Sequence, residues 1–245
     1  MKKYIAAIIL VSFFLNTYAQ DGLSLEAGLI IPPVERELYY DVKPNYIRPL
    51  TKEKIKDAKL LSDLIEGYPT NWISSYVVTE ILTISDGNTV TTKGKNEVLT
   101  AQQKKTLATT EIGSEVAFNV KYIYNNPITD KNEDKEIHVE MTLAPDIEAE
   151  YIEGNEKLIN YFKENTKDKV SKSLFKGMEM ARFGFTIDEK GKAINAKVKN
   201  STGDNIADKV IIDLINKMPN WKPAKDLTGK SVQQEFEFSV GKGGC

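Results

Sequence analysis

Apolar and polar residues alternate with a period of two in several stretches of the chain, which is the pattern of half-buried strands. The clearest stretches before residue 147 are Val116 to Tyr124 and Ile137 to Leu143. A third stretch, Ile73 to Ile84, is rich in β-branched and aromatic residues and ends at the turn signal Asp86-Gly87-Asn88. The pattern therefore predicts three strands before residue 147.

One short helix interrupts these strands. Thr100 stands three residues before Gln103, and this capping-box spacing predicts a helix that runs to about Ala108. The residue pattern predicts a β-rich domain over residues 51–146, which ends where Ala144-Pro145-Asp146 stops the alternation.

The second half of the chain mixes the helical and the strand period. An apolar spacing of 3.6 residues predicts a helix over 155–165, and Asp204 caps a second helix that Pro219 ends. Alternation predicts a hairpin and a final strand, at 183–198 and 232–240. The fold class is therefore α+β, with an N-terminal β-rich domain followed by a domain at 147–241 in which two helices cover a three-stranded antiparallel sheet.

The two ends of the chain have different patterns. Met1-Lys2-Lys3 precedes an apolar run of twelve residues, too short to span a membrane, so we predict a signal peptide over 1–19 that is cleaved after Ala19. An uncleaved anchor is the alternative. Prolines in residues 20–50 favour an extended segment and keep it off central strands. Residues 242–245 form a Gly-rich, flexible tail. We expect a periplasmic protein with no membrane span after cleavage.

Composition restricts the chemistry. Among 245 residues with a net charge of -2, the chain has one His and one Cys, His138 and Cys245. Zinc sites, His-based triads and intrachain disulfides each need at least two such residues. His138 falls on the polar face of its strand, where it would have no partner as a ligand or base. We expect no enzyme, no catalytic residue, no cofactor, no metal and no nucleic-acid partner.

Two motifs in the last third have simpler structural interpretations. Residues Ala224 to Ser231 fit a relaxed phosphate-loop pattern, but a strand rather than a helix follows them, which favours a hairpin with a turn at Gly229. Trp221 stands between Pro219 and Pro223, whose turn directs its ring toward the sheet.

Three segments of the second half carry a resemblance to a known family: Phe183-Gly-Phe-Thr-Ile-Asp-Glu-Lys-Gly-Lys-Ala-Ile, Asn200-Ser-Thr-Gly-Asp204 and Met218-Pro-Asn-Trp-Lys-Pro-Ala224. Residues 148–241 resemble the C-terminal domain of TonB-type energy transducers. The stretch from Gly94 to Gly113 is similar to a β-rich module that precedes such domains in envelope proteins of the Bacteroidetes type.

The resemblance implies a periplasmic module that docks on outer-membrane transporters by adding their extended peptide beside its last strand, through open backbone groups. The family's long Pro-rich spacer and its Tyr-Pro pair after the first helix are missing, so we interpret the chain as a soluble, non-catalytic relative. An outer-membrane transporter or another envelope protein is the expected partner. The backbone edge implied for binding consists of Val232, Gln233, Gln234, Glu235, Phe236, Glu237 and Phe238.

Two alternatives to this hypothesis remain. A hydrolase of envelope glycans needs only two carboxyl groups about 5 to 9.5 Å apart, which a cleft between the two domains would supply. A structural envelope protein would self-associate into a homodimer through the same edge strand. The docking hypothesis itself requires that the flank of the last strand is open.

Overall fold

The computed structural model describes residues 37–85, 87–171, 174–175, 180–219 and 221–242, and the backbone of two short strands before them. Those strands, β1 (Leu25–Glu26) and β2 (Leu29–Ile30), pair with each other in the segment Met1–Glu37. The second compact unit, Leu38–Cys245, is a mixed α+β structure. The predicted signal peptide, Asp86 and Cys245 lie outside the described residues.

The first sheet of the second unit has the strand order β4-β8-β7-β5-β6 among the described residues. Its long strands form two hairpins, β5–β6 and β7–β8, which are joined by the antiparallel pair β5–β7, and only β4 pairs in parallel. The three strands predicted from the alternation are confirmed as β5, β7 and β8. The bounds are β4 (Pro49–Leu50), β5 (Ser75–Ser85), β6 (Asn88–Gly94), β7 (Glu115–Asn126) and β8 (Lys131–Leu143).

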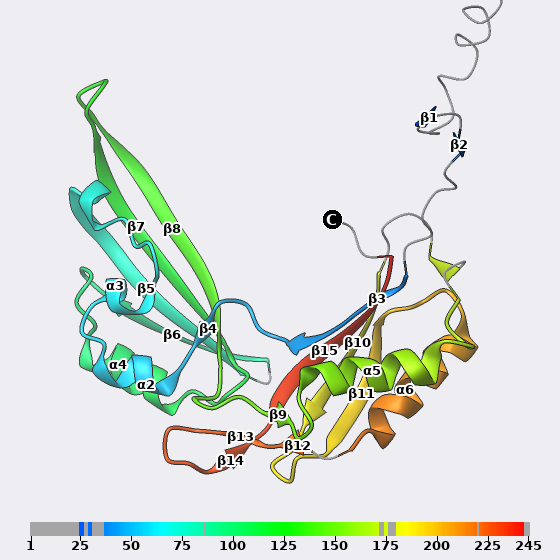
Figure 1. The fold of residues 1–245 in the computed structure, drawn as a ribbon. Helices are drawn as coiled ribbons and strands as arrows, with labels where there is room; N and C mark the ends of the chain where they lie inside the picture. Colours follow the sequence, from blue (N-terminus) through cyan, green and yellow to red (C-terminus); the bar gives the residue numbers. More distant parts are fainter. Residues whose placement is uncertain are drawn as a thin grey trace, which may run out of the picture. The chain divides into compact units, whose positions relative to one another are not determined.

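Helices cover one face of this sheet (Figure 1). Phe118 in the central strand is fully buried, and it packs in a cluster with Leu61 and Leu107 of the helices. The predicted capping box is confirmed, because the Thr100 hydroxyl accepts the Gln103 N–H while the Gln103 side chain accepts the Thr100 N–H. The helical bounds are α2 (Lys52–Asp57), α3 (Leu61–Leu64), the 3-10 turn η1 (Thr70–Trp72) and α4 (Ala101–Thr109).

The second sheet has the order β11-β10-β15-β3, with every pair antiparallel (Figure 1). The predicted hairpin and last strand are present, but the prediction of three strands is wrong, because β3 adds a fourth from the segment before the first sheet. The bounds are β3 (Tyr39–Pro44), β10 (Met180–Ile187), β11 (Ala193–Asn200) and β15 (Gln234–Gly241).

Two helices lie on one face of this second sheet, α5 (Asn155–Thr166) near β3 and α6 (Asn205–Lys217) near β11 (Figure 1). Asp204 caps α6 as predicted, by accepting the N–H groups of Ile206 and Ala207. One apolar residue of α6 does not face the core, because Ile206, in the first turn, is 77% exposed.

Four two-residue strands complete the described structure: β9 (Glu150–Tyr151), β12 (Trp221–Lys222), β13 (Ala224–Lys225) and β14 (Ser231–Val232). Trp221 is buried and meets the ring of Phe236 at 4.8 Å, which confirms its structural interpretation. The phosphate-loop pattern forms the β13–β14 hairpin, with Gly229 at φ 82° in its turn. Within the described residues, no helix is both long and apolar enough to cross a lipid bilayer.

Candidate functional site

The strand expected to present a free edge, β15, is paired on both flanks. β10 pairs along one side, and on the other β3 runs antiparallel from Gly241 opposite Tyr39 to Phe236 opposite Pro44. The prediction of an open backbone edge at Phe236, Glu237 and Phe238 is therefore wrong for this structure. The N-terminal segment supplies the strand that completes those backbone groups.

The first residues of the predicted edge do not belong to the same strand. Val232 is in β14 and pairs with Ala224, and Gln233 lies between β14 and β15, so the predicted strand over 232–240 is broken at Gln233. Gln234 then begins β15. Its side chain is buried, and its amide oxygen accepts the N–H of Ala149 at 2.6 Å. Val232 thus belongs to a separate hairpin, and Gln233 connects that hairpin to β15.

The aromatic side chains of β15 form the core of the second sheet. Phe238 is fully buried and stacks on Phe162 of α5 with a centroid distance of 4.1 Å. Phe236 stacks on Phe185 of β10 at 5.7 Å. These contacts agree with a structural role for both rings. Another chain would therefore contact the backbone of β15 rather than these side chains.

The ladder determines which backbone groups of β15 face β3. The N–H of Asn45 donates to the carbonyl of Glu235 at 2.9 Å, and Pro44, opposite Phe236, has no N–H to donate. Because hydrogen-bonded and non-hydrogen-bonded pairs alternate along an antiparallel ladder, the groups of Glu235, Glu237 and Ser239 point to β3. Those of Phe236 and Phe238 point to β10.

Tyr40 holds one end of β3 against the core. Its ring lies 6.2 Å from that of Phe238, and its hydroxyl lies 2.9 Å from the Thr166 hydroxyl of α5. Since the single proton of Thr166 goes to the carbonyl of Phe162, Tyr40 is the donor in this bond. Burial raises the pKa of the Tyr40 phenol above its ordinary value. The bond therefore secures an aromatic side chain that is half removed from water.

Asn45 holds the other end of β3. In addition to its backbone bond, its side-chain N–H donates to the Glu235 carboxylate at 2.9 Å, and its side-chain oxygen accepts from Lys199 at 2.9 Å. These bonds to β15 and β11 fix the point at which the chain leaves the sheet.

A charged side chain crosses the face of this sheet that the helices leave open. Lys199 extends from β11 over Gly184, where an added Cβ would lie 2.8 Å from its Cε, and reaches the Glu237 carboxylate at 3.4 Å. The Glu237 side chain is buried, and Arg182 also approaches its carboxyl group, at 3.9 Å. The absence of a side chain at Gly184 thus gives Lys199 a path across β10 to β15.

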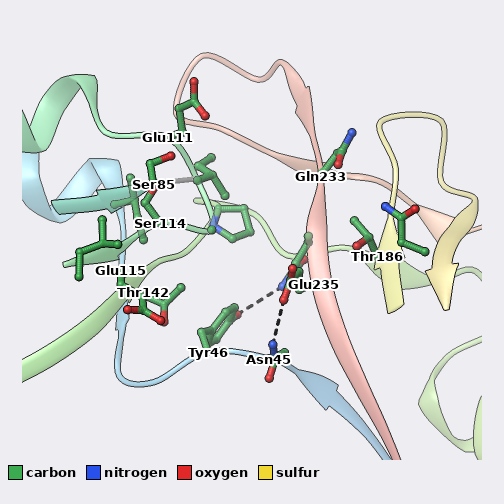
Figure 2. A pocket seen from close by; sticks show the side chains of 17 residues that line it. Asn45, Tyr46, Ser85, Glu111, Ser114, Glu115, Thr142, Thr186, Gln233 and Glu235 are labelled. Carbon is green, nitrogen blue, oxygen red and sulfur yellow. Dashed lines mark hydrogen bonds between the residues drawn. The ribbon is translucent and has the colours of Figure 1, made fainter. Parts of the chain in front are cut away.

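A cleft of about 480 Å³ lies beside the start of β15, within the second compact unit (Figure 2). Tyr46 lies on its wall, where its hydroxyl donates to the Glu148 carboxylate and accepts from the Gln234 amide. Burial, and secondarily the bond to Glu148, raises the pKa of the Tyr46 phenol. The cleft is lined by Asn45, Tyr46, Ile84, Ser85, Glu111, Ile112, Gly113, Ser114, Glu115, Thr142, Leu143, Pro145, Thr186, Asn195, Gln233, Gln234 and Glu235.

The carboxylates of this cleft do not form a buried pair. Among the described acidic residues, Asp208 and Glu237 are the buried ones, and neither lines the cleft. Asp208 accepts hydrogen bonds from Ser201 and Thr202 at the start of α6, while Glu237 contacts Lys199 on the open face of the sheet. No group of three or more potential metal-ligating residues occurs in the described part of the chain.

His138 differs from expectation in one respect. It is exposed, as predicted for the polar face of its strand, but it is not alone, because it contacts the side chains of Asn119 and Glu140 on the same sheet. These contacts account for the histidine as part of a polar surface on the first sheet.

The residue pattern contains a signal for β3 that the expectation of an extended Pro-containing segment did not use. Tyr40, Val42 and Pro44 occupy alternate positions and face the core, while Asp41 and Lys43 face the other way. A proline at the end of such a stretch indicates an edge strand rather than a central one.

Comparisons with known proteins add no identification: no family model, no curated protein and no solved structure matches this chain.

Proposed function

We propose that this protein is a non-catalytic periplasmic binding protein related to the TonB C-terminal domain. It captures an extended segment of an outer-membrane transporter or another envelope protein as a strand beside β15, on the flank that β3 occupies in this structure. The resemblance of residues 148–241 and the signal-like residues 1–19 motivate the family and the compartment.

One observation carries this proposal. The flank of β15 that the resemblance assigns to docking takes up β3, a strand from almost the opposite end of the chain, with no hairpin connecting the two. The edge therefore has the geometry to accept an extended segment, because a foreign strand would use the same backbone groups. The flank is not open, as the docking hypothesis required, so a partner can use these backbone groups only when β3 does not occupy them.

No described contact favours the hydrolase alternative. Catalysis on a glycan would require an acid with a raised pKa and a second carboxyl group that face each other. The Glu235 carboxylate at the cleft instead accepts a hydrogen bond from Asn45, and the two buried carboxylates are held elsewhere.

The test uses the mature protein and peptides from the periplasmic ends of outer-membrane transporters. We expect saturable binding that changes the NMR amide signals of β15 and β3 and leaves those of β7 and β8 unchanged. A folded protein that binds none of these peptides would contradict the docking function. Intact mass of the protein isolated from its cell envelope tests the compartment, because a cleaved leader removes residues 1–19.

A further inference from the structure

We propose that β3 is a built-in occupant of the docking edge, and that a partner binds by replacing it with a segment that copies its side-chain pattern. This inference rests on the proposed function and specifies it. It names the event that opens the site, and it states the chemistry of the segment that fits.

The side chains of β3 define what the edge accepts. A tyrosine at the position of Tyr40 fits between Phe238 and Thr166, where the Thr166 oxygen accepts its hydroxyl proton. Two residues later, Val42 is buried opposite Phe238. Because alternate residues of a strand face the same side, the partner needs an aromatic hydroxyl and a compact apolar side chain two positions apart.

Asp41 and Lys43 alternate with Tyr40 and Val42, so their side chains face the open side of the sheet. One is acidic and the other is basic. Lys43 lies directly opposite Glu237, but that carboxylate is already approached by Lys199 at 3.4 Å and Arg182 at 3.9 Å, so this position sets no requirement for a cation. Pro44 follows, and Asn45 ends the strand with its bonds to Glu235. The fitting segment is therefore extended and antiparallel to β15, in the order tyrosine, any residue, aliphatic, any residue, proline, asparagine.

The two free edges of the sheet are poor alternatives to replacement. On the outer side of β3 the backbone groups belong to Tyr40, Val42 and Pro44, and Pro44 has no N–H. The other edge, β11, has an irregular register, and Asn195 within it has φ 56°. Irregular strands and missing donors prevent the addition of a further strand, so the flank of β15 is the best backbone template once β3 has left.

β3 is also placed so that it can leave alone. The compact unit begins at Leu38, one residue before the strand, and β3 is joined to the rest of the unit by residues 45–48. Arg48 in this connection has φ 42°, a conformation that costs free energy for a residue with a side chain. Because β3 is the outer strand of its sheet, it can detach without unpairing any other strand.

The experiment locks β3 in place with a disulfide that can be reduced. Asp41 and Ser239 are direct cross-strand partners. A hydrogen-bonded antiparallel pair has a Cα separation of about 5.5 Å, within the range of natural disulfides. The full chain carries Asp41→Cys and Ser239→Cys, with Cys245→Ser to remove the native thiol. The probes are a synthetic peptide of residues 37–46 and the transporter peptides.

We expect the reduced protein to bind both kinds of peptide at least tenfold more tightly than the oxidised protein. Tyr40→Ala in the protein should strengthen binding of the 37–46 peptide about tenfold, because apparent affinity rises with the fraction of molecules whose edge is open. A peptide with residues 40 and 41 exchanged, and 42 and 43 exchanged, presents the wrong faces and should not bind. Circular dichroism of the oxidised form confirms that it is folded. If the disulfide does not form, the Tyr40→Ala comparison alone carries the test.

The outcomes separate this inference from the function on which it rests. Equal binding of a transporter peptide to the oxidised and reduced forms would overturn replacement and leave docking intact. Binding of the 37–46 peptide alone, controlled by the disulfide, would confirm an exchangeable β3 and contradict the transporter partner. A dimer of the reduced protein in light scattering would show that the edge exchanges β3 between copies, and would overturn replacement by a foreign segment.

Discussion

The two sheets of the second compact unit are closed in different ways. The long strands of the first sheet form two hairpins, β5–β6 and β7–β8, so each is paired with a neighbour in the sequence. In the second sheet, the last strand lies between β10 and the remote β3. Hairpin pairing forms at a small cost in loop-closure entropy, whereas pairing of β3 with β15 requires most of the chain to be closed into a loop. We therefore expect β3 to be the more easily detached strand.

The exposed edges show the same contrast. β4 pairs only with Thr142 and Leu143, so most of β8 has an outer flank without a partner strand among the described residues. That flank is rich in charge, which is a common protection against unwanted strand pairing. The flank of β15 is instead protected because β3 covers it, and it would be exposed again if β3 detached. The charged residues of β8 are Lys131, Glu133, Asp134, Lys135, Glu136 and Glu140, with His138 between the last two.

The largest effect should come from the ring that supports β15. Phe238→Ala should lower the free energy of unfolding by about 3–5 kcal/mol, because it removes a fully buried aromatic ring that stacks on Phe162. Urea denaturation measures this loss. Phe118→Ala, equally buried in the first sheet, should cost a similar amount. Hydrogen exchange should show loss of protection at the Ser239 amide only in Phe238→Ala. The same loss in Phe118→Ala would contradict a separate response of the two sheets.

A smaller change tests β3 itself. Val42→Ala should cost about 2 kcal/mol from lost burial of two carbon atoms and the cavity left behind. The amides of Glu237 and Ser239, which point to β3, should exchange faster with solvent, while those of Phe236 and Phe238 stay protected by β10. Val90→Ala is the matched control on β6, because Val90 is 50% exposed. Uniform loss of protection along β15 would show that β3 does not detach independently.

The helix caps provide a comparison of the two halves. Asp204→Ala and Thr100→Ala should each cost about 1 kcal/mol in thermal or urea unfolding. Asp204 should cost more, because its carboxylate accepts two backbone N–H groups and the Thr100 hydroxyl accepts one. Asp213→Ala, on the exposed face of α6, is the control and should remain within about 0.5 kcal/mol of the wild type. An equal effect of Asp213→Ala would contradict a specific capping role.

The smallest effect is a pH dependence of β3. Because burial raises the pKa of Tyr40 in the folded state, its neutral form contributes stability that is present below the unfolded pKa near 10. This contribution is lost as the pH rises through the folded pKa. Tyr40→Phe should therefore reduce the fall in stability between pH 9 and pH 11 by less than about 1 kcal/mol, since the phenol is only half buried and is screened by solvent. If the urea midpoint of Tyr40→Phe falls with pH as steeply as that of the wild type, this prediction is contradicted.

Local features of this fold were predictable, and long-range pairing was not. Thr100, Asp204 and Pro219 mark helix ends through bonds or constraints within a few residues, so the sequence predicts them directly. The pairing of Tyr40 with Val240 depends on the assembled sheet, and no short-range pattern specifies a partner so distant in the chain. The same limit applies to Gln234, whose bond to Ala149 fixes the first residue of β15 only after folding.

The proline that ends β3 has a consequence for solubility. With no donor on its outward side, Pro44 interrupts the row of groups that a neighbouring molecule would need for stacking into fibrils. A segment that replaced β3 without a proline at this place would restore that row. Growth of the sheet into an aggregate is thus limited by one residue of the very strand that a partner would displace.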